Sequence, residues 1–149
     1  MESIWTKIND RVPYYLKDIA ERFNIKFVKV DSLCTAAVGK DFIILIFIDR
    51  FYVDVSYIRR DKNNQLVVFE AGNYFAEYFD QEDRKNLLIE NHAADIIINE
   101  LKVINHGLIS KWSNVLEGDT KWLKNYRKSE WFDTRRLSQE EENILGKYI

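Results

Sequence analysis

Residues 42–58 contain two strand-like segments, FIILIFI and FYVDVSYI, on either side of Asp49 and Arg50. β-Branched and aromatic residues dominate both segments, and this composition suits a pleated, buried surface with a polar turn between the strands. We therefore predict a central β-hairpin here. Because Asp-Arg is not one of the pairs that favour a tight type I′ turn, we expect a loop longer than two residues or a bulge.

The two strands of this hairpin differ in their pattern. Residues 42–48 are apolar at every position, so we expect this strand to be covered on both faces by helices, a neighbouring subunit or a partner. The second strand alternates, which is typical of a strand with one packed and one wetter face. Its packed face would carry Phe51, Val53, Val55 and Tyr57, and its other face Tyr52, Asp54, Ser56 and Ile58.

The segment before the hairpin predicts a helix and two strands. Apolar residues recur at spacings of three and four from Ile4 to Phe23, which indicates one amphipathic helical stripe. Pro13 interrupts it, so either a short turn ends near Asn9 and a second helix starts with Asp10 as its cap, or one helix bends. Residues 25–30 and 33–38 then alternate as strands, and residues 65–70 predict a fifth strand after the hairpin.

The rest of the chain has helical spacing. A long helix is predicted from about Arg84 to Glu117, with Gly107 marking a bend or a close approach. Gly118 ends it and Asp119 caps a helix that carries Trp122, Leu123 and Tyr126. Ser138 and Glu141 form a capping box for a terminal helix.

Strands that precede helices, with one helix before them, predict a single α+β domain over residues 1–149. The expected fold is an antiparallel meander of four or five strands after an N-terminal helix. A long helix and shorter C-terminal helices would pack on this sheet. A chain of 149 residues with 46% hydrophobic residues can bury such a core.

Several classes of protein are disfavoured by the sequence. The longest wholly apolar run has seven residues, far short of the ~20 that span a bilayer, and residues 1–8 lack a secretory signal. A cytoplasmic protein without membrane contact is expected. There is no Walker loop, GxGxxG, HExxH, CxxC pair or GxSxG, so we predict no metal and no cofactor.

Single catalytic candidates are weak. Cys34 lies in an apolar run, where a lone cysteine usually packs as a small hydrophobe. His92 and His106 lie fourteen positions apart on the predicted helix, about 21 Å at 1.5 Å per residue, so they cannot share a metal. His92 with Asp95 suits a helix-surface pair better than a catalytic one. We therefore predict no catalytic residue, although an enzyme of unknown chemistry stays an alternative.

Charged side chains suggest two binding surfaces. The polar face of the second hairpin strand ends in charges of both signs, as a protein-binding surface would, and we predict partner contacts at Tyr52, Asp54, Ser56, Arg59 and Arg60. The solvated face of an ordinary sheet would look similar. Lysines and arginines between 111 and 136 alternate with aromatic residues, which is the pattern of a single-strand nucleic-acid site, although core packing explains the aromatics better.

The order of elements, the FYVDV strand and the junction Leu116-Glu117-Gly118-Asp119 resemble small bacterial α+β proteins, several of which are immunity partners of polymorphic or contact-dependent toxins. The resemblance implies a non-catalytic cytoplasmic protein that occludes the active site of a toxin. We thus expect a protein-binding module, with a nucleic-acid-associated protein as the alternative. The oligomeric state cannot be read from the sequence.

Overall fold

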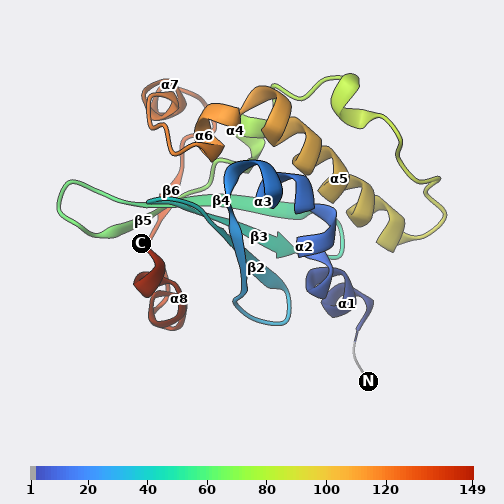
Figure 1. The fold of residues 1–149 in the computed structure, drawn as a ribbon, viewed down its shortest axis with the longest axis horizontal. Coiled ribbons are helices and arrows are strands. Elements are labelled where there is room, and N and C mark those ends of the chain that lie inside the picture. Colours follow the sequence, from blue (N-terminus) through green and yellow to red (C-terminus); the bar gives the residue numbers. More distant parts are fainter. Residues whose placement is uncertain (1–2) are drawn as a thin grey trace.

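A computed structural model describes residues 3–149 and confirms the α+β class with an antiparallel meander (Figure 1). Within these residues the sheet has six strands in sequence order, each antiparallel to the next. The sixth strand was not predicted. The strands are β1 (Lys26–Lys29), β2 (Cys34–Val38), β3 (Ile43–Ile48), β4 (Val53–Arg60), β5 (Leu66–Phe69) and β6 (Thr134–Arg135).

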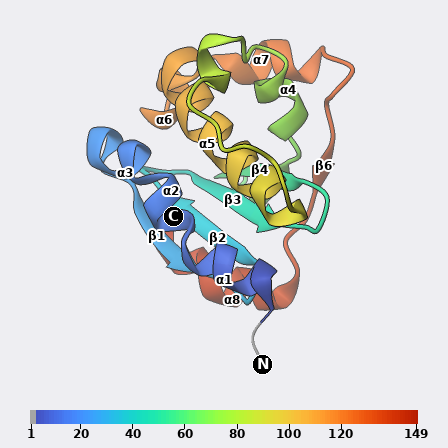
Figure 2. The ribbon, with the colours of Figure 1, turned by 90° about the vertical axis from the view of Figure 1, so that its right-hand side faces the viewer.

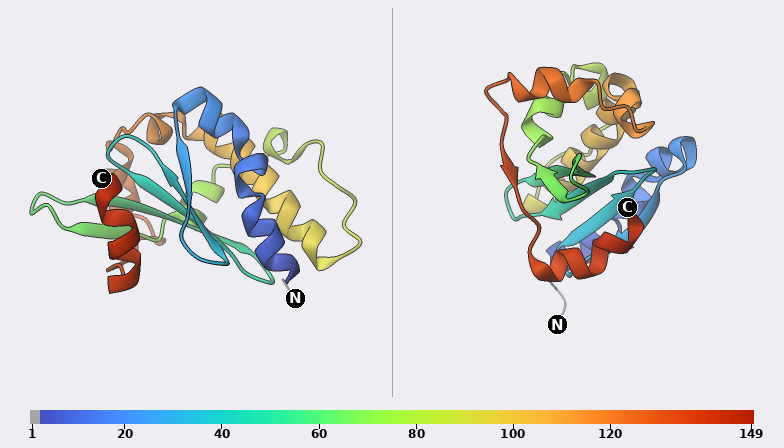
Figure 3. Two further views of the ribbon diagram at one scale, coloured as in Figure 1. Left: turned by 60° about the horizontal axis from the view of Figure 1, so that its bottom comes forward. Right: turned by 90° about the vertical axis from the view of Figure 1, so that its left-hand side faces the viewer.

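Helices cover the two faces of the sheet unequally. The thick layer consists of α1 (Ile4–Asp10), α2 (Val12–Tyr15), α3 (Lys17–Phe23), α4 (Gly72–Ala76), α5 (Ala93–Lys111), α6 (Ser113–Leu116) and α7 (Trp122–Arg127). Among residues 3–149, the helices on the opposite face are α8 (Gln139–Leu145) and the short 3-10 helix η2 (Gly146–Tyr148), as Figures 2 and 3 show. A second 3-10 helix, η1 (Glu82–Arg84), precedes α5.

Strand β3 lies between two hydrophobic cores, as its unbroken apolar sequence predicts. Ile44, Ile46 and Ile48 belong to the large core under the thick helical layer. Ile43 and Leu45 belong to the small core under α8. Phe47 is the exception: α8 does not cover it, and 36% of the residue is exposed.

Pro13 breaks the N-terminal helical stripe. Helix α1 ends at Asp10, and α2 begins at Val12 with Pro13 in its first turn, where the missing N–H costs no hydrogen bond. A third helix, α3, follows from Lys17. Asp10 is therefore the last residue of α1 and not the cap of α2, and its carboxylate pairs with Lys29 at 2.8 Å.

The long helix is shorter than predicted. Helix α5 begins at Ala93 because Asp95 accepts hydrogen bonds from the backbone N–H groups of Asn91 and His92 and so fixes the N-terminus there. Residues 85–92 form a loop, and the side chain of Asn99 bonds both backbone groups of Leu88 at 2.8 and 2.9 Å.

Some of the other predicted helix signals are confirmed. Ser138 and Glu141 form the capping box of α8. Gly118 adopts a φ of 92°, but it follows α6 and not the long helix. Asp119 does not cap α7, whose N-cap is Lys121; its side chain accepts from the N–H of Lys121. Gly107 marks a close approach, because a Cβ there would lie 2.4 Å from the Phe79 ring.

Strand β4 extends beyond its neighbour β5. β5 pairs with residues 57–60 only, so residues 53–56 have no strand along their outer edge. Helix α4 crosses this edge so closely that a Cβ on Gly72 would lie 2.8 Å from the Val55 carbonyl oxygen. Glycine at 72 therefore allows the helix to cover the strand edge.

We predict that Gly72→Ala destabilises the fold by about 1–3 kcal/mol, because the added methyl meets backbone that no side-chain rotation can move. Urea unfolding would measure the change. Gly146→Ala is the matched control: its Cβ has 3.9 Å of room and its φ is −58°, so it should be neutral or stabilise by up to about 1 kcal/mol. A Gly72→Ala variant as stable as the parent would contradict this packing.

Candidate functional site

The loop between β3 and β4 exposes an aromatic pair. It spans residues 49–52, closes with a hydrogen bond from the Asp49 N–H to the Tyr52 carbonyl at 3.0 Å, and confirms the expected longer loop. Phe51 is 81% exposed and Tyr52 is 50% exposed. Phe47 and Asp54 lie opposite each other on the two strands just behind the loop. We call Phe47, Phe51, Tyr52 and Asp54 the hairpin surface.

Ser56 lies deeper than the other predicted contact residues. It is buried, and its hydroxyl donates to Glu70 at 2.9 Å. Glu70 also accepts from Arg135 at 2.7 Å, and Arg135 bonds Glu141 of α8 at 3.2 Å. This network ties β4 to β6 and α8. Burial, together with the negative charge of Glu70, raises the pKa of Asp54 at the exposed end of the network.

Arg59 and Arg60 lie at the far end of β4, so the predicted contact residues form two separate groups. At ~3.3 Å per residue, Arg60 is roughly 26 Å along the strand from Tyr52. Arg59 donates to the Tyr57 hydroxyl and the Gly118 carbonyl. Arg60 donates to the carbonyls of Asn64, Gly146 and Ile149, which anchors the C-terminal segment.

Both arginines also line a basic groove of about 740 Å³ between the β4–β5 turn and α7. Two segments far apart in the sequence supply its cations, which are Arg59, Arg60, Lys62, Lys121, Lys124 and Arg127. Asp61 is the only acidic side chain of its lining. Trp112, Trp122 and Tyr126 are buried in the main core, so these three rings cannot stack on bases.

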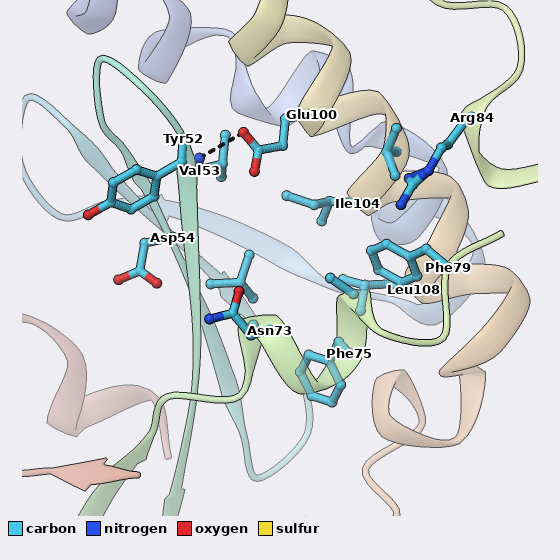
Figure 4. A pocket seen from close by; sticks show the side chains of 14 residues that line it. Tyr52, Val53, Asp54, Asn73, Phe75, Phe79, Arg84, Glu100, Ile104 and Leu108 are labelled. Atoms are coloured by element: carbon cyan, nitrogen blue, oxygen red, sulfur yellow. Dashed lines mark hydrogen bonds between the residues drawn. The ribbon is translucent and has the colours of Figure 1, made fainter. Parts of the chain in front are cut away.

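A pocket of about 440 Å³ opens between β4, α4 and α5 (Figure 4). Glu100 of α5 accepts a hydrogen bond from the Val53 N–H at 3.0 Å, on the edge that β5 leaves unpaired. Burial raises the pKa of this carboxyl, and the bond from Val53 opposes that effect. Tyr52 and Asp54 also line the pocket, and Figure 4 shows their side chains on the side of β4 opposite Glu100.

A second buried carboxylate, Asp83 of η1, holds that segment against α5. Its fully buried side chain accepts from the Asp80 N–H and from three α5 residues, His106, Ser110 and Lys111, at 2.6–3.1 Å. Burial acts to raise the pKa of Asp83, but these hydrogen bonds outweigh it and hold the pKa well below the usual range.

This cluster is not a catalytic triad. Ser110 and His106 both bond the same oxygen of Asp83, so the carboxylate lies between them and the imidazole has no path to the hydroxyl. His92 meets Asp95 through its backbone N–H. Cys34 is buried, and burial followed by the charge of Asp31 raises its pKa to about 12, so its thiol is not a reactive thiolate at neutral pH.

Glu100 and Asp83 were missed by sequence reasoning. Glu100 had a signal, since it lies between the buried helix positions Ile97, Leu101 and Ile104. Asp83 had none, because its three side-chain partners on α5 lie 23–28 residues away. Within residues 3–149 no cluster of three potential ligands could hold a metal ion. Across the same residues, no helix has the length and apolar character needed to cross a bilayer.

No match to a protein-family model, a curated protein or a solved structure was found for this chain.

We predict that Asp83→Asn lowers the free energy of unfolding at pH 7 by roughly 1–2 kcal/mol, because the amide cannot satisfy four donors. The pKa of Asp83 is depressed in the folded state, so its contribution is present above the unfolded pKa of about 4 and is lost as the pH falls further. The difference between parent and variant should therefore narrow from pH 5 to pH 3 in urea unfolding.

Asp133→Asn is the control for this experiment, since the Asp133 residue is exposed and only its backbone groups make hydrogen bonds within the described residues. A difference between Asp83→Asn and the parent that stays constant from pH 7 to pH 3 would refute the assigned role of the ionised carboxylate.

Proposed function

We propose that this protein is a non-catalytic module that binds another protein through the hairpin surface. The observation that supports this most directly is the exposure of Phe47, Phe51 and Tyr52 within six residues of one hairpin. Aromatic side chains are enriched at protein interfaces, and a cluster of them in solvent is costly unless it is covered by a partner.

The charges around these aromatics favour a basic partner. Asp54 is part of the hairpin surface and Asp49 closes its loop, against one exposed cation of the loop, Arg50. Glu70 behind them is paired with Arg135. Complementary charge speeds encounter and fixes orientation. Ile96 is exposed on α5, one turn before Glu100, and Figures 1 and 2 show the hairpin tip beside the first turns of α5.

The specific form of this function that we propose is an immunity protein, which acts in the cytoplasm and occludes a cognate bacterial toxin. Its support is the resemblance in element order described above and the acidic, aromatic character of the hairpin surface. The bond between Glu100 and Val53 holds the start of β4, so such a surface would be largely ordered before binding.

A photocrosslinking amino acid at position 51 should capture one specific partner in cells that naturally produce the protein. The same amino acid at position 132 is the matched control, since Phe132 is also exposed but lies near α7. Tyr52→Ala should reduce capture at position 51 at least tenfold, because central aromatics dominate interface energy. Equal capture at positions 51 and 132, or none at either, would contradict the proposal.

The basic groove favours a second candidate function, the binding of a single-stranded nucleic acid. Six cations around one acidic side chain give a local positive field that the net charge of −2 conceals. Arg59 and Arg60 are held by backbone carbonyls, whereas Lys62, Lys121 and Lys124 are exposed at the mouth. Phosphates would neutralise these lysines.

If this candidate is correct, affinity for a fluorescent single-stranded oligonucleotide falls steeply as salt is added. Lys121→Glu with Lys124→Glu should weaken binding and lower the slope of log K against log salt by roughly 0.7 per lost phosphate contact. Lys26→Glu with Lys40→Glu changes the charge equally on exposed residues outside the groove. No salt-sensitive binding at low ionic strength would eliminate this candidate.

A further inference from the structure

The pocket between β4, α4 and α5 joins apolar side chains to the carboxylate of Glu100. We propose that it binds a small amine with an aromatic or branched aliphatic body. Its volume of about 440 Å³ lies within the ~300–1,000 Å³ range of ligand sites. The ammonium group would face Glu100, and the hydrocarbon body would lie against the apolar walls.

The apolar walls come from three elements that the fold holds in place. Val53 and Val55 belong to β4, Phe75 to α4, and Ile104 and Leu108 to α5. Each of these five side chains belongs to the main core, so the wall is rigid. Phe79 closes the side near α5, and a hydrocarbon ligand would gain from displacing water here.

Glu100 gives the pocket its charge preference. One carboxylate oxygen accepts from the Val53 N–H, and the other forms no hydrogen bond within residues 3–149 and points into the pocket in Figure 4. Satisfying one backbone N–H needs only a neutral acceptor, which a glutamine would supply without charge burial. The free oxygen of this partly buried carboxylate is accessible from the pocket and can accept a hydrogen bond from an ammonium group.

Arg84 favours one orientation of the bound ligand in the pocket. Its side chain makes no hydrogen bond or ion pair to the other described residues, and Figure 4 shows it above Phe79, on the side of the pocket away from Val53. An ammonium group is repelled by this guanidinium and attracted by Glu100. The amine therefore enters with its charged end toward the start of β4.

This inference does not rest on the proposed protein-binding function. Tyr52 and Asp54 belong to the lining of the pocket as well, but Figure 4 shows their side chains on the side of β4 opposite Glu100, so a partner on the hairpin surface can bind without occupying the space beside Glu100. Either proposal can fail while the other stands.

The test is a titration of the full chain with 2-phenylethylamine, followed by amide chemical shifts. We expect saturable shifts concentrated at Val53, Gly72, Asn73 and Ile104, which line the pocket. The neutral analogue 2-phenylethanol should bind at least tenfold more weakly. Glu100→Gln retains an acceptor for Val53 and should weaken amine binding at least tenfold, while Glu140→Gln, on an exposed position of α8, should not.

A second variant separates binding from folding. Ala76→Phe adds a ring at the pocket lining from an exposed position of α4, so it should block the amine while the thermal unfolding midpoint stays near that of the parent. Equal affinities for the amine and the alcohol would overturn the proposal. Unchanged amine binding in Glu100→Gln, or shifts spread outside the pocket at millimolar amine, would also overturn it.

Discussion

The outer edge of β4 between residues 53 and 56 carries backbone groups that β5 is too short to reach. A buried backbone group without a partner costs roughly 1–3 kcal/mol, so the fold must cover this edge in another way. The Glu100 carboxylate accepts from the Val53 N–H and so satisfies one of these groups. Helix α4 crosses the same edge at Val55, where Gly72 allows the close approach. Both contacts bring helices to a strand edge without filling the space between them. The pocket is the result.

The two faces of the sheet also differ in how much of each is covered by helices, and this difference determines which part of the sheet is exposed. Within residues 3–149, seven α-helices cover one face, whereas α8 and η2 cover the other over a smaller core in which Leu145 joins Cys34, Ala36, Ile43, Leu45, Ile58 and Val68. Phe47 and Asp54 lie outside this cover. The hairpin surface therefore lies where the short C-terminal helix leaves the sheet uncovered. The hydrogen-bond network of Ser56, Glu70, Arg135 and Glu141 lies between this surface and α8.

Local patterns predicted the fold class because each element carries its own signal. The apolar run of β3 and the Ser138–Glu141 box are examples. The features that the sequence did not predict depend on contacts with residues far away in the chain. Strand β6 has two residues and exists because Thr134 and Arg135 pair with β5. The hydrogen bonds of Asp83 and Glu100 depend on the packing of η1 and β4 against α5, which the sequence pattern does not predict. The predicted contact residues were assigned to one face, although strand length alone places Arg60 far from Tyr52.

The geometry of β4 also decides whether the two charged surfaces act together. Asp54 and the groove arginines Arg59 and Arg60 lie roughly 17–20 Å apart along the strand, while salt screens exposed charges over about 8 Å at physiological ionic strength. Asp54 and the basic groove therefore have little influence on each other's affinity. They can still orient one large partner, since a partner that spans both ends would meet acidic and basic patches in a fixed order. The net charge of −2 is therefore the sum of separate acidic and basic surfaces, and β4 sets the line along which these surfaces are separated.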